Sequence, residues 1–425
     1  MRVNLYFSYS MTLKPVILQI LPRLESGGVE RGTIEITQAI KQAGMAPLVV
    51  SSGGALIPHI NYMGGQHITM RVASKNPIIM YRNAWKLYQL IKDRGVNIVH
   101  ARSRAPAWSA YFATKWAGIP LVTTFHGIYG TEPLKKLYNR VMLKSARVIA
   151  VSQYVKDHIL SEYKIDESKI RLIPRGVDFL TFDELKVIPD RLAALTKSWR
   201  LPEEFVPIIF CPGRISRIKG HHVLIDALAK MKDQHFLCII AGNDDGHEDY
   251  RVELEEQIVA SGLEGKVRIA NNTGYMTEAY MLCHLVVVPS SKPESFGRVA
   301  IEAQAMGKLV IATDHGGARE TIIPNETGYL VPVDDAEAMC EAIRFALARD
   351  EGTVNAMASY AKQHVRRFFS SDLMKEKTVA VYRELLEEMQ QQAAENNLAE
   401  KSPKEIKKAQ KKAAADAKKD ESTAA

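Results

Sequence analysis

Two glutamates in one short stretch have a spacing that could serve the binding of a hydroxyl-rich ligand. Glu294 lies among loop-forming residues (PESFG), whereas Glu302 lies in the Ala-rich run RVAIEAQA, which is typical of a helix. A carboxylate accepts hydrogen bonds at two oxygens, and the vicinal hydroxyls of a sugar are suitable donors. The stretch therefore predicts a ligand with one sugar unit near the loop and a second along the helix.

The backbone between the two glutamates offers further donors. An apolar run that ends near residue 291 predicts a buried strand, and the helix follows it after a glycine. Ser295, Phe296 and Gly297 are therefore expected at the N-terminus of that helix. The N–H groups at such a position are not used within the helix and attract negative charge or hydroxyl oxygens.

A second loop carries two cations. Arg214 and Lys219 stand in CPGRISRIKG, between a predicted strand and a helix that begins at His221. Two cations and two glycines at a strand-to-helix turn suit a cluster of oxyanions such as a diphosphate. The alternative interpretation of the same residues is a basic turn that holds only solvent or a surface ion pair.

The first half of the chain places ionisable residues at the ends of predicted strands. His126 follows PLVTTF, and Arg102 and Arg104 follow NIVHA. Glu30 and Arg31, in GGVERGT, stand where a helix is expected to begin, and offer a carboxylate for an acceptor hydroxyl and a cation for a phosphorylated acceptor. The alternatives are a structural histidine and an ordinary solvated basic face.

The strands and helices that would position these residues alternate in the same way in both halves of the chain. Short Val- and Ile-rich runs alternate with helical patterns, which predicts two α/β units, each with a doubly wound parallel sheet and its ligand at the carboxyl ends of the strands. Strands are expected at 15–24, 47–52, 97–103, 120–127 and 147–152, and again at 207–214, 236–244, 266–272, 284–291 and 309–317.

Length and pattern divide the 425 residues into three parts. An N-terminal domain is expected over 1–180 and a C-terminal domain over 181–389, with a last helix from Ser371 that returns to the N-terminal domain. Residues 390–425 are poor in apolar side chains and rich in Lys and Ala, so they are predicted to form a disordered or frayed-helical tail.

Composition narrows the class of protein. The content of 46% hydrophobic and 24% charged residues is ordinary for a globular enzyme, and no run of 18 apolar residues predicts a membrane-spanning helix. The four cysteines are far apart, which favours a reducing compartment over disulfides or a zinc site. Residues 1–178 hold 24 Lys and Arg against 10 Asp and Glu, so an anionic partner is expected for the first half.

Together these motifs resemble a known family, the family 4 retaining glycosyltransferases with the GT-B fold, and in detail bacterial enzymes of lipopolysaccharide and other envelope glycans. The resemblance covers roughly residues 14–382. One departure is Arg175, where the family usually has Asn. The segments that carry the resemblance are GRISRIKG (213–220), PESFGRVAIEAQAMGKLVIATDHGGARETI (293–322), IPRGVD (173–178) and ESGGVERGT (25–33).

The resemblance implies a fold of two facing Rossmann-like sheets with a cleft between them, and a role for each residue of the donor site. Arg214 and Lys219 would hold the donor diphosphate, Glu294 and the backbone of 295–297 the transferred sugar, and Glu302 the ribose. His126 would contact the donor sugar near the reacting carbon. The loop with Gly27 and Gly28 would close over the phosphates, and the base would lie near Gly242 and 274–276.

The implied reaction moves a hexose-type sugar from a nucleotide sugar, with a UDP-sugar favoured over GDP- and ADP-sugars. It needs neither a metal nor another cofactor, because the leaving diphosphate takes the acceptor proton while cations and amides stabilise its charge. The expected acceptor is a phosphorylated glycolipid or oligosaccharide such as the lipopolysaccharide core. The expected location is the cytoplasm, at an anionic membrane surface on the inner membrane.

Other classes of protein are less well supported. A nucleotide-sugar 2-epimerase-like isomerase would lack the cationic loop and the two glutamates. A non-catalytic protein that binds glycans or anionic surfaces would need neither the cationic loop nor the two glutamates. Nucleic acid is not expected as a partner, since no stacking motif or helix-turn-helix pattern is present. An NAD oxidoreductase is disfavoured because no G-x-G-x-x-G follows the first strand of either half.

Overall fold

The computed structural model describes residues 14–25, 27–130 and 132–399. The chain divides into two compact units, residues 1–377 and 378–425. Both predicted sheets belong to the first unit. In its described part, the second unit is the continuation of the last helix. The predicted tail beyond residue 399 lies outside the described residues.

The first sheet has seven parallel strands in the order β3-β2-β1-β4-β5-β6-β7. The order reverses beside β1, which is the switch point where α/β sheets of this kind bind ligands. The strands are β1 (Val16–Ile20), β2 (Ala46–Ser51), β3 (Gln66–Thr69), β4 (Val96–Ala101), β5 (Leu121–Phe125), β6 (Arg147–Ala150) and β7 (Ile170–Leu172).

The second sheet repeats this plan with six parallel strands in the order β10-β9-β8-β11-β12-β13. Its order reverses beside β8, so the loops after β8 and β11 lie next to each other. The strands are β8 (Ile208–Pro212), β9 (Leu237–Ala241), β10 (Val267–Ala270), β11 (Leu285–Val288), β12 (Leu309–Thr313) and β13 (Tyr329–Val331).

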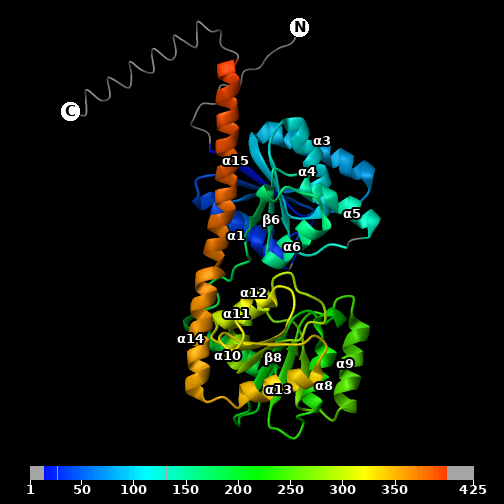
Figure 1. Cartoon of the computed structure of the whole chain (residues 1–425), viewed down its shortest axis with the longest axis vertical. Helices are drawn as coiled ribbons and strands as arrows, with labels where there is room; N and C mark the ends of the chain where they lie inside the picture. The colour runs from blue at the N-terminus through cyan, green and yellow to red at the C-terminus, as the bar shows by residue number, and fades with distance from the viewer. Residues whose placement is uncertain (1–13, 26, 131, 400–425) are drawn as a thin grey trace, which may run out of the picture. The chain divides into compact units, whose positions relative to one another are not determined.

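Helices cover both faces of each sheet (Figure 1). Around the first sheet lie α1 (Gly28–Gln42), α2 (Ile57–Tyr62), α3 (Pro77–Arg94), α4 (Arg104–Ala117), α5 (Pro133–Asn139) and α6 (Gln153–Glu162). Further along the chain follow α7 (Pro189–Ser198), α8 (His221–Ala229), α9 (Glu248–Ala260), α10 (Met276–Leu282), α11 (Arg298–Ala305), α12 (Ala318–Thr321), α13 (Ala336–Leu347), α14 (Glu351–Phe368) and α15 (Ser371–Ala399).

The central strands are apolar throughout because both of their faces are covered. Ile17 and Leu18 are neighbours in β1 and point to opposite faces, yet both are fully buried. Ile209 and Phe210 in β8 show the same burial and belong to two separate apolar cores. Continuous apolar runs are typical of parallel sheets that are covered on both faces.

The predicted α/β architecture of two doubly wound sheets is confirmed, and each strand expected from the sequence is present. Three short strands were missed, namely β3, β7 and β13. Helix α14 was also missed. Residues 390–399 continue helix α15, which agrees with the frayed-helical alternative for this segment rather than with disorder. A run of Gln, Ala, Glu and Asn lacks an apolar face but consists largely of good or neutral helix formers.

Candidate functional site

The two predicted donor loops meet at the carboxyl edge of the second sheet. The ammonium of Lys219, after β8, forms an ion pair of 2.7 Å with Oε1 of Glu294, after β11. The hydroxyl of Ser290 donates to the same oxygen, also at 2.7 Å. Burial pushes the pKa of Glu294 up, but Lys219 and the hydrogen bond from Ser290 outweigh it and hold the pKa below its ordinary value. The carboxylate is therefore fixed in its charged form.

A cavity of only about 10 Å³ lies next to this carboxylate. Ser290, Glu294, Gly297 and His315 are among its lining residues. The ring of His315 donates from Nε2 to the carbonyl of Ser290 at 2.6 Å. Its Nδ1 is buried without a hydrogen-bond partner among the described residues. The cavity has room for about one water molecule, which could bond to these polar groups.

Glu302 is positioned differently from Glu294. It is buried on α11, where Arg298 pairs with Oε1 at 3.1 Å and the hydroxyl of Tyr280 donates to Oε2 at 3.2 Å. Both carboxylate oxygens therefore have partners from the protein. The structure places Glu302 on the predicted helix, and its contact with a ribose stays a prediction.

Close approaches of backbone shape the loops around these groups. A Cβ on Gly242 would lie 1.8 Å from the carbonyl oxygen of Gly213, so the loops after β8 and β9 touch through their glycines. Gly220 has a φ of +68°, and a Cβ there would lie 1.8 Å from the carbonyl oxygen of Pro289. Only glycine allows both the backbone conformation and the contact. Arg214, between these glycines, is exposed.

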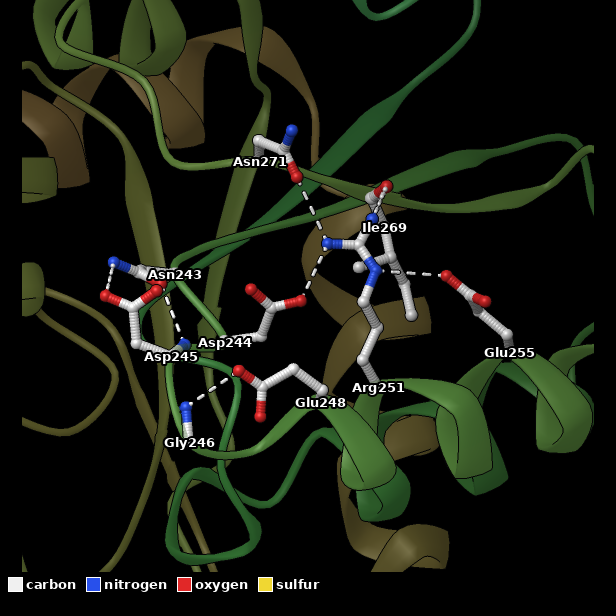
Figure 2. Close-up of polar contacts among 9 residues, drawn as sticks. All are labelled: Asn243, Asp244, Asp245, Gly246, Glu248, Arg251, Glu255, Ile269 and Asn271. Carbon is white, nitrogen blue, oxygen red and sulfur yellow. Dashed lines mark hydrogen bonds and ion pairs between the residues drawn. The ribbon is translucent and has the colours of Figure 1, made fainter.

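The loop where the base is expected is held by an arginine that sequence reasoning missed. Figure 2 shows Arg251 of α9 with its guanidinium between the loops that follow β9 and β10. It bonds Asp244 and Asn271, each at 3.1 Å, and Glu255 on its own helix at 3.1 Å. Arg251, Asn271 and Tyr275 also line an open groove along β10, the edge strand. A cation four residues before a glutamate, as in Arg251 and Glu255, is a sequence pattern that could have indicated part of this network.

The carboxyl edge of the first sheet gathers cations that are buried. Arg102 and Arg175 are only 3% and 8% exposed, and both guanidinium groups lie against Gly32 of α1. A Cβ on Gly32 would lie 2.4 Å from the nearer nitrogen of Arg175 and 3.1 Å from that of Arg102. Arg102 also donates to the side chain of Gln19 in β1 at 2.9 Å. The glycine therefore makes room for two positive charges beside a helix N-terminus.

Arg175 also bonds His126, at 2.7 Å between Nη2 and Nδ1. Arginine can only donate, so Nδ1 must accept and the proton of the neutral ring sits on Nε2. Burial and the nearby charge of Arg175 lower the pKa of His126 well below its ordinary value, so the ring is neutral. Nε2 is buried and has no hydrogen-bond partner among the described residues. It is a donor available to a ligand oxygen.

Burial shifts the pKa values of charged groups at this edge of the sheet. Burial, then Arg102 and Arg298, lower the pKa of Arg175 to about 9. Burial likewise raises the pKa of Glu35, although Arg298 and Arg175 oppose that shift. A bound anion would stabilise the charged form of Arg175.

The remaining predicted residues of the first half do not all join this cluster. Arg104 bonds Asn139 at 3.1 Å and lies 4.2 Å above the ring of Tyr129, so it points away from Arg102. Arg31 is exposed on α1. Glu30 lies over Gly27, since a Cβ on that glycine would lie 2.5 Å from its carboxylate. Gly28 lies near the guanidinium of Arg298, within 3.6 Å of such a Cβ.

Comparisons with known proteins identify the family of this chain. The family described as glycosyl transferases group 1 matches residues 196–364, and glycosyltransferase family 4 matches residues 26–179. A solved glycosyltransferase from Rickettsia africae ESF-5 is 41% identical to this chain, with a TM-score of 0.82 over 88% of this chain and 99% of that one.

Two further proteins extend the comparison. A D-inositol 3-phosphate glycosyltransferase of Kribbella flavida is 25% identical over 86% of this chain and 92% of its own length. The Anabaena protein Alr3699/HepE, solved with UDP and glucose, is 24% identical over 86% of this chain and 99% of its own, with a TM-score of 0.74, which shows a shared fold. These relatives do not single out enzymes of lipopolysaccharide.

Proposed function

The chain belongs to the GT-B glycosyltransferases of family 4, and on that premise we propose that it transfers a hexose-type sugar from a nucleotide diphosphate, with retention, to a phosphorylated acceptor of the cell envelope. The observation that carries the donor half of the proposal is the ion pair of Lys219 and Glu294 at the switch point of the second sheet. A UDP-sugar is favoured as donor, and the solved neighbour with UDP and glucose supports this choice.

In the proposed reaction the protein positions the reactants and stabilises charge. The bond between the anomeric carbon and the diphosphate breaks, and the acceptor oxygen attacks from the same face. The leaving diphosphate takes the acceptor proton. Lys219 and the exposed Arg214 would stabilise the charge that develops on the diphosphate, and a metal is not needed for that role. Glu294, fixed by Lys219 and Ser290, would orient the sugar hydroxyls.

The acceptor half of the proposal rests on the cations around Gly32. Arg102 and Arg175 are buried side by side, and burial and the neighbouring arginines lower the pKa of Arg175 although nearby carboxylates oppose that shift. A phosphate group would compensate it with two charge-assisted contacts. The inositol 3-phosphate in the printed name of the Kribbella relative is a phosphorylated polyol and supports this class of acceptor.

The proposed acceptor is a glycolipid or oligosaccharide of the envelope, such as the lipopolysaccharide core, reached at the cytosolic face of the inner membrane. The basic first half supports an anionic surface as partner, because 24 Lys and Arg oppose 10 Asp and Glu in residues 1–178. None of the helices in the described part of the chain is long and apolar enough to cross a bilayer.

The donor site is tested by thermal shift with UDP, GDP, ADP and CMP, each with and without an attached sugar. A ligand that binds only the folded state stabilises it by about 2.7 kcal/mol at a hundredfold excess over Kd. We expect a shift with UDP that is lost in Arg214→Ala and kept in Arg217→Ala, since Arg217 is paired with Glu253. The absence of any nucleotide shift would contradict the proposal.

Transfer itself is tested with the nucleotide sugar selected in that way, with and without chelator. Inositol 3-phosphate and a lipid-linked phosphorylated glycan serve as acceptors. Transfer to a phosphorylated acceptor in the presence of chelator, with the anomeric configuration of the donor, is the expected result. Conversion of the donor to a sugar epimer without any acceptor would instead indicate an isomerase.

A further inference from the structure

Helices α3 and α4 carry an exposed cluster of large apolar side chains, which we call the aromatic face. It consists of Ile78, Tyr81, Trp85 and Tyr88 on α3 and Trp116 on α4. Ile78, Tyr81, Trp85 and Trp116 are 72%, 63%, 55% and 37% exposed. Single exposed apolar residues are ordinary, but a contiguous group of aromatic side chains marks a surface that binds something.

The aromatic face is continuous because its rings contact one another. Trp116 lies 5.7 Å from Tyr81 and 6.3 Å from both Trp85 and Tyr88, measured between ring centroids. On α3 the members recur at intervals of three and four positions, which places them on one side of the helix. The rings therefore form one continuous patch of aromatic side chains across two helices.

Further apolar side chains extend this surface toward α5. Phe112 contacts Trp116 at 6.1 Å, and Trp108 contacts both Phe112 and Tyr138, at 6.3 and 6.1 Å. A chain of ring contacts thus joins the aromatic face to α5. There, Leu134 and Leu137 are 83% and 57% exposed.

The charges around the aromatic face are almost all of one sign. Residues 71–147, which include α3, α4 and α5, contain 14 Lys and Arg, ten of them exposed, but only two acidic residues, Asp93 and Glu132. Exposed cations stand directly beside the face, among them Arg82 and Lys86 on α3 and Lys115 on α4. Such a surface attracts anions over its whole width.

We infer that the aromatic face docks on a lipid bilayer that contains anionic headgroups. Tyr and Trp have an apolar body and a polar tip and are enriched at the level of the headgroups. Lys and Arg beside them contact the lipid phosphates, so that the apolar and the electrostatic contributions act together. The inference deepens the proposed function, because it names the surface by which the enzyme would reach a membrane-bound acceptor.

A second copy of this chain is a poorer occupant of the same surface. In a two-fold contact the aromatic face would meet itself, and the excess of cations would then face an equal excess of cations. Like charges brought together in this way oppose association. An anionic bilayer neutralises the same charges.

The test uses the full chain and two kinds of vesicles, pure phosphatidylcholine and phosphatidylcholine mixed with phosphatidylglycerol. We expect cosedimentation with the mixed vesicles that weakens as salt is added, because salt screens the attraction of exposed charges. Tryptophan emission should shift to the blue on binding. Trp85→Phe should reduce that shift, since Trp85 is one of four tryptophans.

Variants assign the binding to the surface. Tyr81→Ser with Trp85→Ser should weaken binding at least about tenfold, as the loss of two interfacial side chains implies. The matched control is Phe345→Ser with Tyr360→Ser, which removes two exposed aromatic side chains from α13 and α14. Arg82→Glu with Lys86→Glu tests the charges without touching the rings. Lys197→Glu with Lys232→Glu, two exposed lysines elsewhere, is its control.

Some outcomes would overturn the inference. One is a failure of the wild type to bind the mixed vesicles. Another is an equal loss of vesicle binding in the control variants. A third is self-association in solution that the serine variants abolish. Thermal shift with UDP on the same samples separates this failure from that of the proposed function. The residues of the donor site lie after β8 and β11 and do not include α3 or α4. A normal UDP shift without vesicle binding would contradict the docking surface alone.

Discussion

The two sheets of this enzyme end in sites of different electrostatic character. At the second sheet, cations have carboxylate partners, as in Lys219 with Glu294 and Arg298 with Glu302. At the first sheet, Arg102 and Arg175 are buried together around Gly32, and the pKa of Arg175 falls to about 9. At the second sheet these cations form ion pairs with carboxylates, whereas at the first sheet two guanidinium groups are packed against the same glycine.

Under the proposed function, this difference would suit one fold to two substrates. The pair at the second sheet is preorganised, because Glu294 is charged and held by Lys219 and Ser290. At the first sheet, burial and neighbouring arginines lower the pKa of Arg175, and nearby carboxylates oppose that shift only in part. An anionic ligand there would stabilise the charged form, so we expect a phosphorylated acceptor to bind better than a neutral one.

The largest expected effect comes from breaking the ion pair of Lys219 and Glu294 at the second sheet. Lys219→Met removes the charge that would stabilise the leaving diphosphate and leaves Glu294 without its cation. We expect kcat for transfer to fall by about 10²–10³-fold, the range found when one group that stabilises a transition state is removed. The measurement is steady-state transfer at saturating donor and acceptor.

The control for this variant lies in the same loop. Arg217→Met removes an exposed cation that pairs with Glu253 rather than with the donor site. Its kcat should stay close to that of the wild type. Equal rates for Lys219→Met and the wild type would show that the donor site has been wrongly assigned.

A smaller effect, on the acceptor, is expected from the first sheet. Arg175→Met should raise the KM for a phosphorylated acceptor by about 10–100-fold, as the loss of a hydrogen bond to a charged group implies. The thermal shift with UDP should persist. Lys41→Met, which removes an exposed cation from the C-terminal end of α1, is the matched control.

The same variant separates a phosphate contact from a merely structural role. With an acceptor that lacks its phosphate, Arg175→Met and the wild type should have the same KM. If the KM rises equally for both acceptors, Arg175 acts through another residue, such as His126, which it contacts. The electrostatic difference between the two sheets would then not explain the binding of a phosphorylated acceptor.

The next effect tests how tightly the cations pack around Gly32. Gly32→Ala places a Cβ 2.4 Å from the guanidinium of Arg175, so this side chain must move. Overpacking costs about 1–3 kcal/mol, whereas alanine in place of glycine inside helix α1 gains about 1 kcal/mol, so we expect the free energy of unfolding to fall by about 1 kcal/mol. In Gly28→Ala the nearest atom of Arg298 lies at an ordinary 3.6 Å, so the change should stay within about 0.5 kcal/mol. Denaturant unfolding measures both, and equal losses would contradict the close contact.

The fold could be predicted well because its strands have a strong pattern. Central strands such as β1 and β8 are buried on both faces and are therefore apolar throughout. β3 (QHIT) escaped prediction, since it is a short edge strand with exposed or half-buried side chains. For residues 390–399 the sequence left disorder and a frayed helix both open, because this segment lacks an apolar stripe.

The candidate site could be predicted only where its residues share a local motif. Glu302 and Lys219 stand in recognisable loops and helices, and their elements were placed correctly. That Lys219 bonds Glu294 could not be predicted, because the two residues are 75 positions apart. Arg175 was noticed as a departure from the family, yet its partner His126 lies 49 positions away, directly after β5. Partners of that kind are set by the topology of the sheet.

The smallest expected effect tests a property that the two sites share. Each keeps a neutral histidine near its cations, His126 at the first sheet and His221 at the second. Burial and Lys219 lower the pKa of His221 to about 3, below the ordinary value of about 6.5 in an unfolded chain. Below about pH 6.5 the unfolded chain therefore takes up a proton that the native state does not, so stability is lost as the pH falls.

His221 should account for a loss of about 0.8 kcal/mol in the free energy of unfolding between pH 8 and pH 6. His221→Asn should remove that part of the pH dependence, as measured by denaturant unfolding at the two pH values. His59→Asn, which removes a histidine exposed on α2, is the control and should leave the dependence unchanged. An unaltered slope in His221→Asn would mean that this ring is protonated in the native state. The cations of the second sheet would then be less well compensated than their ion pairs imply, and the contrast with the first sheet would be weaker.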